Sequence, residues 1–237
     1  MTSSASADTP GTPKAEPAAE KPAGAPEQRV ELVEERTEST TTWANADGTT
    51  TVQTFTGPIR VKKPGGGWTP VDTTLIAENG VVKPKSAAAD IAFSGGGSED
   101  PLATASRGSR SFGIGWDGRL PEPELDGSTA LYRNAVDGGD LVVTALKEGF
   151  SHSVILRERP EKPVTFRLPV EADGLTLEET ADRRLHWEDG KGRVVAAAPL
   201  PVMWGSGEES VSGNPGISLP STSWSRRTRR APARFWS

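Results

Sequence analysis

The sequence predicts an all-β protein: a β-sandwich-like array of short antiparallel strands between two tails without regular structure. About a dozen short segments rich in Val, Thr and aromatic residues recur at roughly 8–12-residue spacing, which is typical of sandwiches and barrels. Turn-forming residues bound these segments, and the 237-residue chain contains 26 Gly and 20 Pro, well above the usual share. No stretch with the helical 3.6-residue period extends beyond about ten residues.

The N-terminal residues 1–28 are mainly Ala, Pro, Thr, Ser, Glu and Lys. Such a composition buries too little apolar surface to offset the entropy of ordering, so we expect a disordered tail. Ala5-Ser6-Ala7 has the small-residue form of an export cleavage site, but no apolar segment precedes it. Two interpretations stay open: a secreted or cell-surface protein whose signal lies upstream of Met1, or a cytoplasmic protein that starts there.

A first hairpin is predicted from two Thr-rich segments, 40–43 and 49–55. They flank an Asp-Gly dipeptide that ends at Gly48, and glycine supplies the positive φ that a tight hairpin turn requires. In the second segment Val52 and Phe55 break strict alternation, which predicts a bulge between them.

A second hairpin is predicted from residues 59–62 and 68–75, which flank the glycine run 65–67. Before both hairpins, residues 30–36 suit either a strand or a helix. Another glycine run, 95–97, lacks the lysine and the following helix of a phosphate loop, so we interpret it as a turn or linker.

The same alternation of short apolar segments and turn residues continues to residue 197. The further expected strands are 81–82, 91–93, 102–106, 111–116, 129–132, 141–146, 152–157, 164–168, 175–177, 184–187 and 193–197. We therefore expect one β-rich module over residues 29–204.

Residues 205–237 are expected to form a linker and a basic tail, because their composition matches nothing upstream. After residue 220 the tail contains five arginines and no acid. This composition is typical of a GC-rich gene read out of frame, and a basic anchor for polyanions is the alternative. The net charge is −5, so without these five arginines residues 1–220 carry −10. An acidic body does not attract nucleic acid, and we expect no specific nucleic-acid partner.

The residue inventory excludes several kinds of site. The chain has no Cys, which excludes disulfides, thiolate zinc sites, iron–sulfur clusters and a cysteine nucleophile. His152 and His186 are the two histidines, too few for a multi-histidine metal centre. No apolar run approaches the ~20 residues of a membrane-spanning helix. We expect no cofactor, no metal and no catalytic residue.

Acidic side chains are candidates for glycosidase pairs or calcium ligands, because both chemistries use carboxylates. Most of them lie in turn sequences, where acids are usually solvated, so some pairs are expected by chance. The residues considered are Asp72, Glu122, Glu124, Asp137, Asp140, Asp182, Glu188 and Asp189.

Two tryptophans are the candidate ligand-binding residues. Exposed tryptophan faces can stack on sugar rings, whereas the alternative is that large aromatic rings fill a core. Trp116, which has glycines on both sides, and Trp187 are the candidates for sugar stacking. Trp43 and Trp68 are expected in the core.

Several strings carry a resemblance to a known group of proteins. They are WANADGT (43–49), GPIRVK (57–62), GWTPVDTTL (67–75), GDLVVTA (139–145) and GF (149–150) before VIL (154–156). In this order they resemble the N-terminal β-rich region of large secreted actinobacterial proteins of the RHS/YD-repeat or polymorphic-toxin type, or those with DNRLRE or laminin-G-like modules. The resemblance covers roughly residues 29–204 and implies a structural module without known catalytic residues.

These observations predict a non-catalytic structural or interaction module of a secreted or cell-surface bacterial protein, and a fragment of a longer chain. Its expected partners are other domains of that polypeptide or cell-surface components. A carbohydrate-binding β-sandwich is the first alternative, and a glycoside hydrolase is the second.

Overall fold

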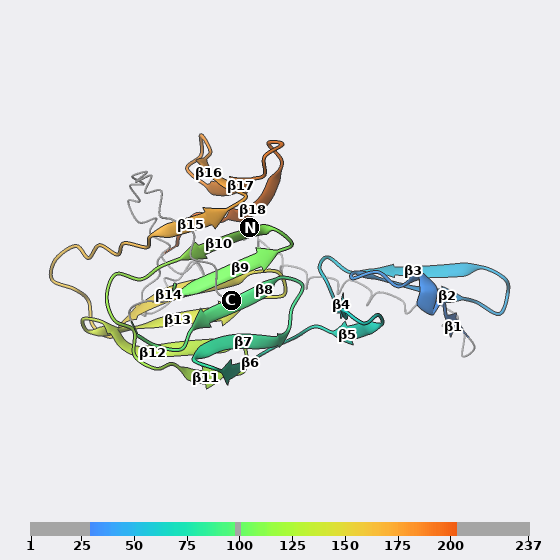
Figure 1. The fold of residues 1–237 in the computed structure, drawn as a ribbon, viewed down its shortest axis with the longest axis horizontal. Coiled ribbons are helices and arrows are strands. Elements are labelled where there is room, and N and C mark those ends of the chain that lie inside the picture. The colour runs from blue at the N-terminus through green and yellow to red at the C-terminus, as the bar shows by residue number, and fades with distance from the viewer. Residues whose placement is uncertain (1–28, 98–100, 203–237) are drawn as a thin grey trace, which may run out of the picture. The chain divides into compact units, whose positions relative to one another are not determined.

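The computed structural model describes residues 29–97 and 101–202. Nearly all of their regular structure is β-strand, and the strands pair antiparallel (Figure 1). This confirms the all-β prediction. The expected tails, 1–28 and 205–237, lie outside the described residues.

The chain divides into two compact units, Met1–Val71 and Asp72–Ser237. The sequence predicts one module over residues 29–204 and gives no sign of this boundary. The described part of the first unit holds a three-stranded sheet, ordered β1-β2-β3, and the hairpin β4-β5. Its elements are β1 (Val30–Glu31), the 3-10 helix η1 (Val33–Glu35), β2 (Thr40–Ala44), β3 (Thr50–Thr54), β4 (Arg60–Lys62) and β5 (Trp68–Pro70).

Both predicted hairpins are present in the first unit. Gly48 adopts φ of 80°, and the Asp47 carboxylate accepts the backbone N–H of Thr49 at 2.9 Å, which fixes the turn. The β2–β3 register is regular, so the bulge expected between Val52 and Phe55 is wrong. The ambiguous residues 30–36 split into a short strand and a 3-10 turn.

The described part of the second unit contains three antiparallel sheets. The first, ordered β15-β10-β9-β8-β7-β6, consists of β6 (Asp72–Glu78), β7 (Val81–Ser86), β8 (Asp90–Ser94), β9 (Ala103–Arg107), β10 (Arg110–Ile114) and β15 (Val170–Asp173). The second, ordered β11-β12-β13-β14, consists of β11 (Glu124–Asp126), β12 (Thr129–Val136), β13 (Gly139–Ala145) and β14 (Phe150–Leu156). The third, ordered β16-β17-β18, consists of β16 (Thr176–Glu179), β17 (Leu185–Glu188) and β18 (Val194–Ala198).

The six-stranded and four-stranded sheets share one apolar core, which makes the second unit a β-sandwich (Figure 1). Alternate residues of each strand point inward, as strand geometry requires, so Ile91 and Phe93 of β8 meet Leu141 and Val143 of β13 in one buried cluster. Tyr132 is also fully buried there.

The hydroxyl of Tyr132 donates a 2.7 Å hydrogen bond to the backbone carbonyl of Ser94. This bond links β12 of the four-stranded sheet to β8 of the six-stranded sheet. It also gives the buried hydroxyl oxygen of Tyr132 a hydrogen-bond partner inside the core. Burial raises the pKa of Tyr132, because ionisation would place a charge in apolar surroundings.

Residues 95–97 are more than the expected turn or linker. A Cβ on Gly95 would lie 2.0 Å from the carbonyl oxygen of Gly80, so the backbones approach too closely for any side chain. Gly97 then forms an isolated antiparallel bridge with Leu120.

The predicted strand 164–168 is wrong, because this segment between β14 and β15 is irregular. Pro163 and Pro169 bracket it, and proline has no N–H to contribute to a ladder.

Trp43 and Trp68 are half-buried rather than core residues. The guanidinium of Arg29 lies over the Trp43 ring, 4.2 Å from its centroid.

Candidate functional site

A shallow groove at the end of the β10–β15 pair is the best candidate site. The N–H of Gly115 donates to the carbonyl of Pro169 at 2.7 Å, which extends the pairing beyond Ile114. The extension brings Trp116 beside Phe166, with ring centroids 6.2 Å apart and ring planes inclined by 24°. Both rings are half-buried, and Trp116 also packs against the core.

Three polar residues complete the lining of this groove, which has a volume of about 270 Å³: Asp117, Thr165 and Arg167. Their side chains are exposed. Among the described residues, neither the Asp117 carboxylate nor the Arg167 guanidinium forms an ion pair or hydrogen bond with another side chain. We call this set of five residues the Trp116 groove. It combines an apolar wall with an acceptor, a hydroxyl and a forked donor.

Trp187, the second predicted stacking residue, does not belong to this groove. It is 5% exposed, and its ring stacks on Phe112 with centroids 4.7 Å apart. Its indole N–H has no hydrogen-bond partner in the described residues. A ring enclosed in this way has no face to offer a sugar, so the prediction for Trp187 is wrong.

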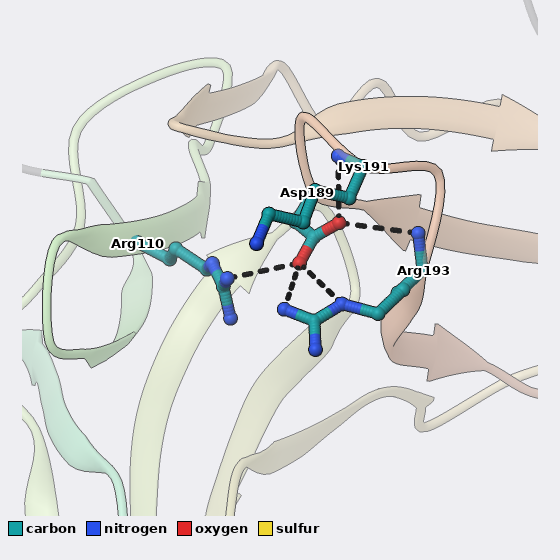
Figure 2. Close-up of polar contacts among 4 residues, drawn as sticks. All are labelled: Arg110, Asp189, Lys191 and Arg193. Carbon is teal, nitrogen blue, oxygen red and sulfur yellow. Dashed lines mark hydrogen bonds and ion pairs between the residues drawn. The ribbon is translucent and has the colours of Figure 1, made fainter.

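Asp189 is a candidate catalytic or calcium-binding carboxylate in the sequence, but in the structure it accepts hydrogen bonds from two arginines (Figure 2). Its side chain is 3% exposed and accepts two hydrogen bonds from the Arg193 guanidinium, at 2.7 and 3.0 Å. Arg110, at the start of β10, donates a third at 2.9 Å. The backbone N–H groups of Lys191 and Arg193 add two more. The hydrogen bonds from Arg193 are the main reason why the pKa of Asp189 lies well below its ordinary value.

Asp189 therefore connects the turn between β17 and β18 to the six-stranded sheet. Both oxygens of its carboxylate already accept hydrogen bonds, and two of the donating groups are guanidinium cations, which would repel a calcium ion. These contacts indicate that Asp189 holds the sheet β16-β17-β18 against the six-stranded sheet.

Other weighed carboxylates are also engaged. The backbone N–H of Asn134 and the Arg157 guanidinium hold Asp140, and both lower its pKa. Arg133 donates to Glu124 at 2.6 Å and lowers its pKa. Every described carboxyl group with a shifted pKa is shifted downward, whereas a general acid needs a raised pKa.

The histidines lie apart from the Trp116 groove. His152 faces Val143 across the β13–β14 pair, and its neighbour Ser151 faces Thr144 on the opposite side of the sheet. No hydroxyl adjacent in sequence can therefore be activated by His152, as strand alternation predicts. His186 contacts the Glu188 carboxylate of its own strand at 2.8 Å.

In residues 29–97 and 101–202, no group of three or more His, Asp and Glu side chains is arranged to hold a metal ion. Over the same part of the chain, no helix has the length and apolar character needed to span a membrane. No protein-family model matches the sequence, no curated protein matches it, and no solved structure matches the fold.

Sequence reasoning found Trp116 but missed the other four residues of the groove. Asp117 directly follows Trp116, so the sequence could have indicated that its carboxylate lies near the ring. Phe166 and Arg167 lie in a proline-bracketed segment far along the chain, and nothing local indicates that it returns to Trp116. That return depends on the direct pairing of β15 with β10, although the four strands β11–β14 lie between them in the sequence.

Proposed function

We propose that the protein is a non-catalytic interaction module whose second unit binds a carbohydrate in the Trp116 groove. The observation that carries this proposal is one concave surface in which two half-exposed aromatic rings lie beside a carboxylate and a guanidinium that have no side-chain partner among the described residues. Ligand sites typically combine an apolar wall with a few polar groups that fix orientation.

Sugar chemistry matches this combination. One face of a pyranose ring presents C–H groups, which pack on an aromatic surface, while its hydroxyls both donate and accept hydrogen bonds. In the groove Asp117 can only accept, Arg167 can only donate, and the Thr165 hydroxyl can do either. The two charges cancel, which favours an uncharged polyhydroxyl ligand over a strongly anionic one.

A binding role is better supported than hydrolysis. Glycoside hydrolysis uses two carboxyl groups about 5–10 Å apart on either side of the bond. Asp117 is the one carboxylate among the residues that line the groove. The resemblance noted above is also to modules without known catalytic residues, which supports placing this one in a longer secreted or cell-surface protein.

Calorimetric titration with soluble oligosaccharides of glucose, galactose and N-acetylglucosamine tests the proposal. We expect one of these to bind the full chain, and Trp116→Ala to weaken binding at least about tenfold, the effect of losing a central aromatic contact. Arg167→Ala should weaken it as well. Arg119→Ala is the matched control, because Arg119 is exposed and close in sequence but does not line the groove.

The proposal is overturned if none of these saccharides binds. It is also overturned if Arg119→Ala weakens binding as much as Arg167→Ala, since general surface charge would then explain the affinity.

A further inference from the structure

The described part of the first unit lacks an apolar core of its own. Within its described residues, 29–71, only Thr41, Thr42 and Pro58 are buried. The buried Val, Leu, Ile, Phe, Trp and Tyr side chains of the described chain all belong to the second unit. A three-stranded sheet normally needs an apolar face packed against another layer, or further strands, to be stable in water. The first unit is therefore an incomplete sheet.

The outer edge of β3 is the open side of this sheet. The N–H of Asn45 donates to Thr49 and the N–H of Phe55 donates to Ser39, and both bonds run between the β2 and β3 sides of the hairpin. In an antiparallel pair such bonds alternate along the strand, so the N–H and C=O groups of alternate β3 residues point away from β2. These residues are Thr50, Val52 and Thr54, and no described backbone group pairs with that edge.

β3 also lacks the features that protect edge strands. Natural edges usually carry a charged residue, a proline or a bulge. No residue from 48 to 58 is charged, β3 contains no proline, and its register with β2 is regular. Val52, at its centre, is 59% exposed. Threonine and valine favour strand pairing.

Two other edges are better protected. β1 is two residues long, and its Glu31 is held by two 2.7 Å hydrogen bonds from Arg36. The β17–β18 pair has a register shift near Val194, and Pro199 follows β18 at once.

We propose that β3 pairs antiparallel with β3 of a second copy of this chain, about a twofold axis at Val52. In that register Val52 faces the same residue of the other copy, Thr50 faces Thr54, and Thr51 faces Gln53. No charge opposes another along the strand, and β-branched side chains face each other, a favourable cross-strand arrangement. Every open N–H and C=O group of the edge gains a partner. The two three-stranded sheets become one continuous sheet of six strands.

Charge favours a second copy as the occupant. Residues 29–71 contain five basic and five acidic residues, so the described part of this unit carries no net charge although the chain as a whole is acidic. Pairing at this edge therefore brings together described segments whose own charges balance, which limits the repulsion that these segments exert on each other. The contact is of the self-complementary type that twofold symmetry requires.

Light scattering on the size-separated full chain measures the outcome. We expect a molar mass of twice 25.0 kDa for the wild-type chain and of one chain for Val52→Lys, because two lysines would face each other across the axis. Val194→Lys is the matched control, since Val194 is a 58% exposed valine on another edge strand. It should leave the double mass unchanged. A monomeric wild type, or a dimeric Val52→Lys variant, overturns the proposal.

A second experiment does not depend on Val52→Lys folding. Because the chain has no Cys, Val52→Cys introduces a single thiol. A short bis-maleimide should join Val52→Cys chains into a covalent dimer, while Val194→Cys chains stay monomeric. Equal cross-linking of both variants, or none of Val52→Cys, contradicts pairing at β3. Binding of saccharide at the Trp116 groove is measured separately, so either proposal can fail alone.

Discussion

Tyr132→Phe is a sharp test of how the two sheets of the sandwich are joined. The substitution keeps the ring and removes the hydroxyl that donates to the Ser94 carbonyl at 2.7 Å. Tyr132 is 0% exposed, so water cannot replace the lost donor without opening the core. A buried acceptor left without its partner costs about 1–3 kcal/mol, and we expect about 1.5 kcal/mol here.

Urea unfolding followed by circular dichroism measures this loss. The midpoint should fall while the slope stays the same, because the surface exposed on unfolding is unchanged. For a chain of this length the same loss lowers Tm by about 3–6 °C. A shift below about 1 °C would show that the hydroxyl has another partner or that the core admits water.

Alkaline pH gives an independent measurement, because Tyr132 is the sole tyrosine of the chain. Its pKa is raised by burial in the folded protein and is about 10 in the unfolded chain. The stability linked to this group is therefore fully present below pH ~10 and declines above it, by up to about 1.4 kcal/mol per pH unit. Tyr132→Phe should lose this dependence.

Tyrosinate absorbance reports this ionisation directly. We expect it to develop together with unfolding, as followed by circular dichroism. A titration with a pKa near 10 in a chain that keeps its native circular dichroism would refute the burial of Tyr132.

Two further predictions concern Asp189 and Gly95. Arg193 holds the pKa of Asp189 below its ordinary value, so the ionised carboxylate contributes stability above about pH 4 that is lost as the pH falls. Asp189→Asn should therefore lower the urea midpoint at neutral pH. The midpoint of the variant should also depend less on pH in the acid range. A midpoint unchanged at every pH would contradict the role of Asp189 in holding the third sheet. Gly95→Ala would place a Cβ 2.0 Å from the Gly80 carbonyl oxygen and should cost about 2–4 kcal/mol in urea unfolding. Gly149→Ala meets open space and should change the free energy of unfolding by no more than about 0.5 kcal/mol, and equal effects of the two would remove the argument for a close crossing.

Local sequence signals predicted the hairpins because a turn depends on the residues that form it. Gly48 adopts positive φ where the Asp-Gly dipeptide indicated a turn, and Gly66 and Gly67 do the same in the second hairpin. The alternation of apolar and polar residues also located most strands, since it reflects one buried and one exposed face.

Long-range contacts decided what the sequence could not predict. Trp116 and Trp187 both lie next to strand-forming residues, yet one borders a groove and the other is enclosed. The difference comes from Phe112, which stacks closely on Trp187, and from Phe166, whose ring lies beside Trp116 at a greater centroid distance. The division after Val71 was not predicted for a related reason: the described part of the first unit has the strand pattern of a folded module without its buried apolar residues.

The order of strands has a consequence for how the second unit folds. Within the described sheets, hydrogen-bonded neighbours are also neighbours along the chain, except for β10 and β15. Hairpins between successive strands close short loops and are expected to form early, whereas joining β10 to β15 closes a long loop that contains the whole four-stranded sheet. We expect the Trp116 groove to be among the last parts of this unit to assemble during refolding. A saccharide that occupies it would then slow unfolding without accelerating refolding, because its binding surface is absent from the transition state.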